Sequence, residues 1–281
     1  MTVVQAMASD AYRASAGVSH SELKLLRMRT PWHLYMQRLR PERIERPSPQ
    51  MILGSATHCA VLEPDEFEKR YCLAIDASKN SNAWKQFALE CSANDTTPLD
   101  VDQMEAVRGM RESLRSHPEV KRALSKQGHS EVSAWWRDPK TQVLCKCRPD
   151  YVADVSSRHG AGVLLLDLKT TADASRASFA KSIANFGYHT QADWYTRGYS
   201  IASDADVMSM LFVVVESSYP FACAAYVLDP DALVEAAALN RDALARYAQC
   251  MADDKWPGYS EDVERIDIPR WAYTASLETY L

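Results

Sequence analysis

The sequence predicts an α/β protein in which a mixed central β-sheet is flanked by helices. The chain up to about Ser130 carries the apolar spacing and the proline boundaries of successive helices. Three β-like runs follow, and then two helices, two further strands and one long helix. Strands and helices that interleave in this order are typical of a sheet with helices packed against its faces.

The first helical pattern covers residues 18–39. Ser19 precedes it and Glu22 stands three residues later, which is the spacing of a capping box at a helix N-terminus. We expect Pro31 to divide the stretch into two helices, because proline lacks the backbone N–H that a continuous helix needs.

Two further helices are predicted in the first half of the chain. One covers residues 51–64 and is ended by its final proline, and the other covers residues 99–117 with Asp100 as its N-cap. Residues 40–49 contain three prolines and are predicted to form a loop. Residues 76–98 include a polar stretch for which no element is predicted.

The second half of the chain contains the predicted sheet. Runs of β-branched and aromatic residues bounded by turn residues indicate strands, and the first three runs are expected to form a meander. The strands are predicted at 130–138, 142–155, 162–171, 207–217 and 221–229, the helices at 172–185, 189–202 and 230–253, and an irregular tail at 256–272.

Composition excludes several classes of protein. The 281 residues carry a formal net charge of −5, so a uniformly basic nucleic-acid coat is not expected. No apolar run is long enough to span a bilayer. The N-terminus lacks the charged and then apolar regions of a signal peptide, so we expect a cytoplasmic protein without membrane contact. The seven cysteines include no C-x-x-C pair and are expected to be reduced.

The strand predicted at 162–171 ends in charged residues. An unbroken apolar run, typical of strands buried on both faces, leads directly into Asp167 and Lys169. Alternate residues of a strand share a face, so these two side chains point the same way and Leu168 points the other. Asp150 follows a proline on the preceding strand, and in a meander it can converge with Asp167 at one edge of the sheet.

Two converging carboxylates repel each other and raise each other's pKa unless a cation lies between them. Oxygen ligands suit Mg²⁺ or Mn²⁺, and a lysine nearby can hold a water nucleophile or neutralise charge on a phosphoryl group. These residues therefore predict a metal site for phosphodiester hydrolysis. The alternative for Asp167 and Lys169 is a salt bridge on an exposed edge strand.

These residues resemble the signature of the PD-(D/E)xK nucleases. Pro149-Asp150 and Asp167-Leu168-Lys169 match that signature, with sixteen residues between the two acidic positions. The resemblance implies a restriction-endonuclease-like core sheet with a helical N-terminal part. It implies a flexible N-terminus over residues 1–18 and a single nuclease domain over residues 19–281, of which 19–128 is mainly helical and 129–281 holds the core.

Two further motifs resemble those of the RecB-like nucleases. The sequence GSATHCAVLEP places His58 where these nucleases have a histidine ligand on a helix, and Gln191 and Tyr195 match their Q-x-x-x-Y motif. The sequences around Glu131 and in the C-terminal tail resemble RecE-type exonuclease VIII and its phage and prophage relatives. The resemblance extends over residues 19–272.

The resemblance implies roles for the matched residues. His58, Asp150 and Asp167 would bind the metal, with the backbone carbonyl of Leu168 as a further ligand, and Lys169 would position or activate water. The residues that would support them are Glu131 on the first core strand, which would ligate metal or orient the lysine, and Gln191 and Tyr195, which share one helix face.

The cofactor implied is Mg²⁺, for which Mn²⁺ can substitute. Some relatives hold an iron–sulfur cluster with four cysteines. Only Cys223 and Cys250 follow the Q-x-x-x-Y motif, so no such cluster is expected here.

The function implied is an exodeoxyribonuclease that digests double-stranded DNA from its ends, 5′ to 3′, and leaves 3′ single-stranded tails for recombination and repair by annealing. The resemblance also implies a homo-oligomeric ring, such as a tetramer, that works with a single-strand annealing protein. Two alternatives stay open. The same site would serve a structure-selective or single-strand nuclease, and the chain would serve as a DNA-binding recombination scaffold if its site were inactive.

One segment is locally basic. Between Lys24 and Arg46 there are seven lysines and arginines and two acids, a local charge of +5. These residues predict either a basic surface that binds DNA phosphates or a helix face exposed to solvent. Trp32 and Tyr35, in the same segment, would either stack on a DNA end or pack in the core.

Overall fold

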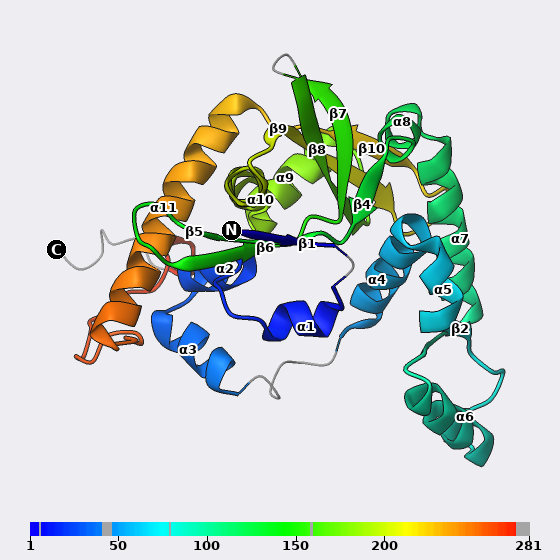
Figure 1. Cartoon of the computed structure of the whole chain (residues 1–281). Coiled ribbons are helices and arrows are strands. Elements are labelled where there is room, and N and C mark those ends of the chain that lie inside the picture. The colour runs from blue at the N-terminus through cyan, green and yellow to red at the C-terminus, as the bar shows by residue number, and fades with distance from the viewer. Residues whose placement is uncertain (6, 41–46, 79, 158–159, 274–281) are drawn as a thin grey trace.

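A five-stranded mixed sheet lies at the centre of the computed structural model, which describes residues 1–281 except 6, 41–46, 79, 158–159 and 274–281 (Figure 1). Its strand order is β10-β9-β8-β7-β4. Strands β8 and β9 run parallel and the other neighbours run antiparallel, which confirms the predicted mixed sheet. The strands are β4 (Gly128–Ser130), β7 (Tyr151–Ser157), β8 (Gly160–Thr171), β9 (Asp206–Glu216) and β10 (Cys223–Tyr226).

A second, three-stranded antiparallel sheet contains β1 (Thr2–Val4), β5 (Ser133–Arg137) and β6 (Leu144–Cys147). The predicted three-stranded meander is therefore wrong in part, because the run at 142–155 is divided into β6 and β7, which belong to different sheets. Pro149 lies in the break, where its missing N–H leaves no ladder hydrogen bond unmade. Strands β7 and β8 do form the expected antiparallel hairpin.

Residues 1–18 are called the N-terminal segment below, and their described part is docked on this second sheet, although we expected the segment to be flexible. Strand β1 pairs with β5, and α1 (Ser9–Ala14) follows it. Lys146 on β6 is almost fully buried, and its Nζ donates hydrogen bonds to the carbonyl oxygens of Tyr12 at 3.0 Å and Ser15 at 2.7 Å. An ammonium group that donates to carbonyl oxygens at a helix C-terminus anchors the segment.

The first helices follow the predicted caps. Helix α2 (His20–Met28) begins after Ser19, and the capping box with Glu22 is present. Helix α3 (Pro31–Leu39) begins at the proline that was expected to separate the two helices. Of the predicted loop at 40–49, residues 41–46 lie outside the described residues.

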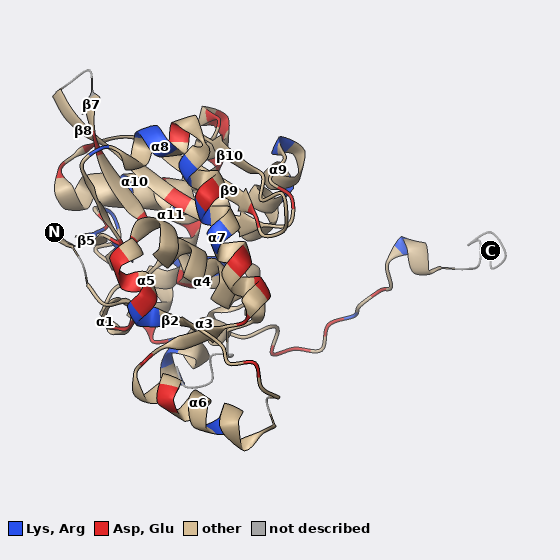
Figure 2. Cartoon of the chain, turned by 90° about the vertical axis from the view of Figure 1, so that its right-hand side faces the viewer, with Lys and Arg blue, Asp and Glu red and all other residues tan. Residues whose placement is uncertain are grey.

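The helix that carries His58, α4 (Pro49–Leu62), starts two residues before its predicted beginning because Ser48 caps it. The proline expected to end it instead starts a further helix, α5 (Pro64–Arg70), since proline fits the first position of a helix. Helix α6 (Asn82–Ala93) lies within the polar stretch for which no element was predicted, and it projects from the body of the protein (Figures 1 and 2).

Helices cover both faces of the central sheet. On one face lie α7 (Val101–Ser116), which has the predicted capping box at Asp100, and the unpredicted α8 (Pro118–Leu124). The long helix over 230–253 was predicted with its observed bounds. The helices on the other face are α9 (Arg176–Phe186), α10 (Tyr188–Ser203) and α11 (Pro230–Asp253).

Alternate residues of β8 face these two helical layers. Leu165 packs into the core formed with α9, α10 and α11, whereas Leu166 and Leu168 pack into the core formed with α7 and α8. Asp167 and Lys169 consequently lie on the same side of the strand as Leu165. The alternation predicted from the sequence is confirmed.

The described residues after α11 are irregular, as predicted, apart from one short 3₁₀ helix, η2 (Arg270–Ala272), and this tail extends away from the body (Figure 2). A short parallel pair of strands, β2 (Tyr71–Leu73) and β3 (Thr97–Leu99), joins the two ends of the segment that contains α6. Among the described residues, no helix is both long and apolar enough to cross a membrane.

Candidate active site

Strand β8 brings an acid and a base to the side of the sheet that α10 covers. Asp167 is only 1% exposed, and its Oδ2 lies 2.5 Å from Lys169 Nζ. Gln191, in the first turn of α10, donates from Nε2 to Asp167 Oδ1 at 2.6 Å. Gly187 makes this approach possible, because its φ of 69° lets the chain leave α9 and enter α10 without a break.

Lys169 is held as a charged group. Burial alone would lower its pKa, but the carboxylates of Asp167 and Asp150 outweigh burial and raise the pKa above its ordinary value. The ammonium also lies 4.7 Å from the centroid of the Tyr188 ring, a cation–π contact. At neutral pH this ammonium can donate hydrogen bonds and offset negative charge, but it cannot accept a proton.

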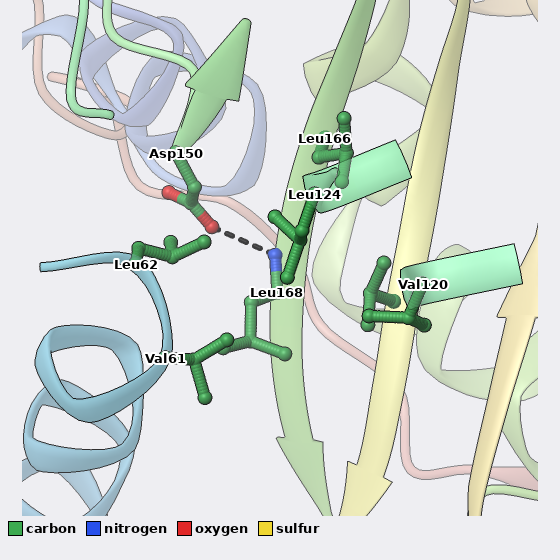
Figure 3. Close-up of a pocket in the computed structure, with 8 residues that line it drawn as sticks. Val61, Leu62, Val120, Leu124, Asp150, Leu166 and Leu168 are labelled. Atoms are coloured by element: carbon green, nitrogen blue, oxygen red, sulfur yellow. Dashed lines mark hydrogen bonds between the residues drawn. The ribbon is translucent and has the colours of Figure 1, made fainter. Parts of the chain in front are cut away.

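Asp150 lies immediately before β7 and beside β8. Its Oδ2 accepts a hydrogen bond from the backbone N–H of Leu168 at 2.7 Å (Figure 3). A small apolar pocket of about 10 Å³, lined by side chains that include Leu62 and Leu166, adjoins the carboxyl group. Burial and the charge of Asp167 raise the pKa of Asp150 to about 8.

His58 and Glu131 complete a cluster with Asp150, called the cation cluster below. One potential ligand atom from each residue lies within 4.8 Å of the others, and His58 Nδ1 is 3.4 Å from Asp150 Oδ2. Burial and the charge of Lys169 lower the pKa of His58. The imidazole is therefore neutral at pH 7 and has a lone pair to offer a metal.

Glu131 does not lie on the first core strand, where the sequence pattern placed it. It lies in the connection between β4 and β5 with a φ of 53°, and its backbone N–H donates to the Asp150 carbonyl at 2.9 Å. Arg148 Nε donates to its carboxylate at 2.6 Å. Its ion-pair partner is therefore this arginine, and the suggested role of Glu131 in orienting Lys169 has no such contact to support it.

The donor set fits a divalent cation. Two carboxylates and a neutral imidazole are groups that Mg²⁺ or Mn²⁺ can accept as ligands. Asp167 lies outside the cation cluster, because Lys169 and Gln191 hold its carboxylate. Its Oδ2 is nevertheless buried and, apart from the lysine ion pair, has no hydrogen-bond partner among the described residues. Metal binding by Asp167 and by the Leu168 carbonyl stays a prediction.

Tyr195 lies one turn after Gln191 on α10, as the Q-x-x-x-Y spacing predicts. Burial, and then the neighbouring Tyr12, raise the pKa of Tyr195 well above its ordinary value, so its hydroxyl stays protonated. No hydrogen bond joins that hydroxyl to another part of the described chain. Its contribution to the site therefore stays a prediction.

Two residues of the site were missed by sequence reasoning. Arg148 pairs with Glu131, and the ring of Tyr188 lies beneath the Lys169 ammonium. The signal for Arg148 was its place directly before Pro149-Asp150, where a cation stands beside one acidic position of the signature. Tyr188 begins α10 only three residues before Gln191, but nothing in its spacing pointed to a lysine on another strand.

An open groove of about 1400 Å³ adjoins the site. Two of its lining residues bond acids of the site, since Gln191 donates to Asp167 and Arg148 donates to Glu131. The groove therefore reaches Asp167 and Glu131 through these two residues. Its lining comes from α1, α2, β6 and α10, and includes Tyr12, Lys24, Arg148, Gln191 and Tyr195.

Cation binding is expected to strengthen as the pH rises from about 6 to about 8. The pKa of Asp150 rises from its ordinary 3.8 to about 8 in the metal-free protein, so the folded chain holds a proton there that the unfolded chain has lost. This proton makes the free energy of unfolding fall as the pH rises between these two values, and a cation must displace it. We expect Mn²⁺ to raise the melting temperature more at about pH 8 than at about pH 6. Equal shifts at both pH values would contradict this assignment.

The fold and the site together define a PD-(D/E)xK protein: a mixed sheet delivers Asp150, Asp167 and Lys169 to one place, with a helical histidine beside them. The family described as "PDDEXK-like domain of unknown function (DUF3799)" matches residues 19–269, and the chain belongs to this family. The predicted nuclease superfamily and fold class are thereby confirmed, whereas the RecE-type resemblance stays a prediction.

Among solved structures, the chain is similar to a crystal structure from Eubacterium rectale described as a "Putative exonuclease". The two chains are 12% identical, with a TM-score of 0.62, and the match covers 94% of this chain and 96% of that chain. At this identity the likeness shows the shared fold. No curated protein matches the chain.

Proposed function

We propose that this protein is a Mg²⁺-dependent exodeoxyribonuclease that hydrolyses double-stranded DNA from its ends, 5′ to 3′, and leaves 3′ single-stranded tails for annealing recombination. The observation that carries the proposal is the cation cluster of His58, Glu131 and Asp150 beside the paired Asp167 and Lys169. A PD-(D/E)xK fold with this donor set is suited to phosphodiester hydrolysis.

The cation cluster would hold the metal, with Asp167 and the Leu168 carbonyl as further ligands. Mg²⁺ bound there supplies Lewis acidity toward a phosphate oxygen and lowers the pKa of a water molecule. Gln191 keeps the Asp167 carboxylate in one orientation by donating to Oδ1, which leaves Oδ2 turned to Lys169.

Lys169 acts in this proposal as a donor. Its raised pKa keeps it charged, so it would hold the attacking water or stabilise the charge that develops on the phosphate. The Asp167 carboxylate and the Tyr188 ring fix the position of the ammonium before substrate arrives. A fixed cation costs little reorganisation when the transition state forms.

The basic segment after Lys24 contributes to DNA binding only in part. Arg27 donates to Asn240 at 2.9 Å and to Thr190 at 2.7 Å, which ties α2 to α10 and α11. Arg38 pairs with Glu22 at 2.7 Å and is likewise a structural residue. Lys24 lines the groove, and we propose that it contacts phosphates of the substrate.

The aromatic residues of this segment pack with the C-terminal tail. Tyr35 stacks on Trp256 with ring centroids 5.6 Å apart, and Trp32 lies 5.7 Å from Tyr35. Trp32 is still 48% exposed, so its outer face is free to meet a DNA end.

Linear duplex DNA labelled at either the 5′ or the 3′ end, incubated beside a closed circle with Mg²⁺, tests the activity directly. We expect early release of the 5′ label, later release of the 3′ label and an intact circle. Cleavage of the circle would favour the structure-selective nuclease and contradict end dependence. An absence of turnover with both Mg²⁺ and Mn²⁺ would favour the DNA-binding scaffold.

We propose a homo-oligomer, such as a tetramer, because a closed ring around DNA would make digestion processive. The 3′ tails would pass to a single-strand annealing protein. Light scattering of the purified protein measures its mass in solution. A monomer at working concentration would contradict the ring.

A further inference from the structure

The N-terminal segment is built into the molecule, although the family match begins only at residue 19. Three residue pairs join β1 to β5, and Trp135 Nε1 donates to the Ala16 carbonyl at 3.2 Å. Lys146 anchors the end of α1 by donating from Nζ to the carbonyl oxygens of Tyr12 and Ser15. The segment is thus held at both of its ends, and its middle forms part of the groove.

Tyr12 is the residue of this segment that reaches toward the site. Its ring lies against two cations, with Lys146 Nζ 5.0 Å and the Arg148 guanidinium carbon 5.4 Å from the ring centroid. Trp135 meets the ring in an edge-on contact with centroids 5.9 Å apart. Tyr12 lines the same groove as Gln191.

Arg148 depends on the N-terminal segment for its position. Its Nε donates to Glu131, and its Nη2 donates to the Met7 carbonyl at 2.8 Å. Its Nη1 is buried and has no hydrogen-bond partner within the described chain. The face of the Tyr12 ring lies against this guanidinium, and an aromatic face attracts a cation that has one buried N–H group without an acceptor.

We propose that Tyr12 is a positioning residue, which holds Arg148 so that the Glu131 carboxylate meets His58 and Asp150. The contacts run from the Tyr12 ring to Arg148, from Arg148 to Glu131, and from Glu131 to the cation cluster. The N-terminal segment thereby completes the metal site without supplying a ligand. The inference rests on the proposed function in assuming that the cation cluster binds a divalent metal.

Two substitutions in the full chain separate the ring face from the hydroxyl and from side-chain volume. Tyr12→Leu removes the aromatic face, and we expect it to weaken Mn²⁺ binding, measured by calorimetry, by roughly tenfold or more. Tyr12→Phe keeps the face and is expected to bind Mn²⁺ as the native chain does. Tyr226→Leu, which removes a stacked tyrosine on β10, is the matched control and should leave Mn²⁺ binding unchanged.

A double-mutant cycle tests whether Tyr12 acts through Arg148. We expect Arg148→Ala to weaken Mn²⁺ binding, and Tyr12→Leu to add little to that loss in the double variant, because coupled residues are not additive. Additive losses, or Mn²⁺ binding by Tyr12→Leu equal to that of the native chain, would overturn the proposal.

Separate controls address loss of folding and loss of DNA cleavage. If Tyr12→Leu does not fold, Arg148→Lys takes its place, because lysine keeps the charge but lacks the planar guanidinium whose Nε and Nη2 donate to Glu131 and Met7. Native Mn²⁺ affinity in Arg148→Lys would overturn the proposal. Calorimetry needs no DNA, so a native chain that binds Mn²⁺ but cuts no DNA would contradict the exonuclease proposal while leaving this inference to the Tyr12 and Arg148 variants.

Discussion

Asp150→Asn is expected to reduce DNA cleavage by about a thousandfold while DNA binding is retained. The carboxylate is the one member of the cation cluster that touches both His58 and the backbone of β8. Asparagine can still accept the Leu168 N–H, so β7 and β8 should stay in place, but it cannot supply the negative charge that a divalent cation needs. The measurements are cleavage of labelled duplex, Mn²⁺ calorimetry and a DNA-binding titration.

Asp154→Asn is the matched control for this variant. Asp154 lies on the same strand, β7, and is exposed, so the same change of charge there should alter neither cleavage nor Mn²⁺ binding. Native cleavage by Asp150→Asn would remove Asp150 from the mechanism. Loss of DNA binding together with cleavage would point instead to a binding role for the carboxylate.

Lys169→Met is expected to reduce cleavage by about a hundredfold and to lower the free energy of unfolding by about 3 kcal/mol. Methionine has similar volume but no charge, so the change leaves Asp167, which is 1% exposed, without its ion-pair partner. An unpaired buried carboxylate is costly, and a cation offers it a new partner. Mn²⁺ should therefore stabilise Lys169→Met more than it stabilises the native chain in thermal unfolding.

Two comparisons make this second expectation specific. Adding Asp167→Asn to Lys169→Met should restore stability in the absence of metal, because the unpaired charge is removed. Lys181→Met, on the exposed side of α9, should change neither stability nor cleavage. A stable and fully active Lys169→Met would show that the lysine is neither a structural partner nor a catalytic residue.

The helices whose ends were predicted correctly are set by short-range sequence signals. The capping boxes at Ser19 and Asp100 depend on residues three positions apart, and both are present. The long helix at 230–253 has a proline at its first position and an aspartate cap, and its predicted bounds are the observed ones. Such signals depend on backbone groups within one turn, so distant packing does not disturb them.

The elements that were missed depend on distant partners or weak patterns. Residues 1–18 are placed by β5 and Lys146, more than a hundred residues later in the sequence. The run at 142–155 has uniform strand character, and only the separation of two sheets in space shows where it divides. Helix α6 has a side-chain cap at Ser81 but a polar composition that gives little periodicity.

The acid–base pair on β8 follows from the local order of residues alone. A strand alternates its faces every residue, so Asp167 and Lys169 had to point together. The antiparallel pairing of β8 with the preceding strand, β7, brought Asp150 alongside. The groups that surround these residues are set by long-range packing. His58, Glu131 and Arg148 come from a helix and two connections far apart in the chain, and their meeting depends on how helices pack against sheet edges. That packing is a property of the whole core, which no local spacing encodes.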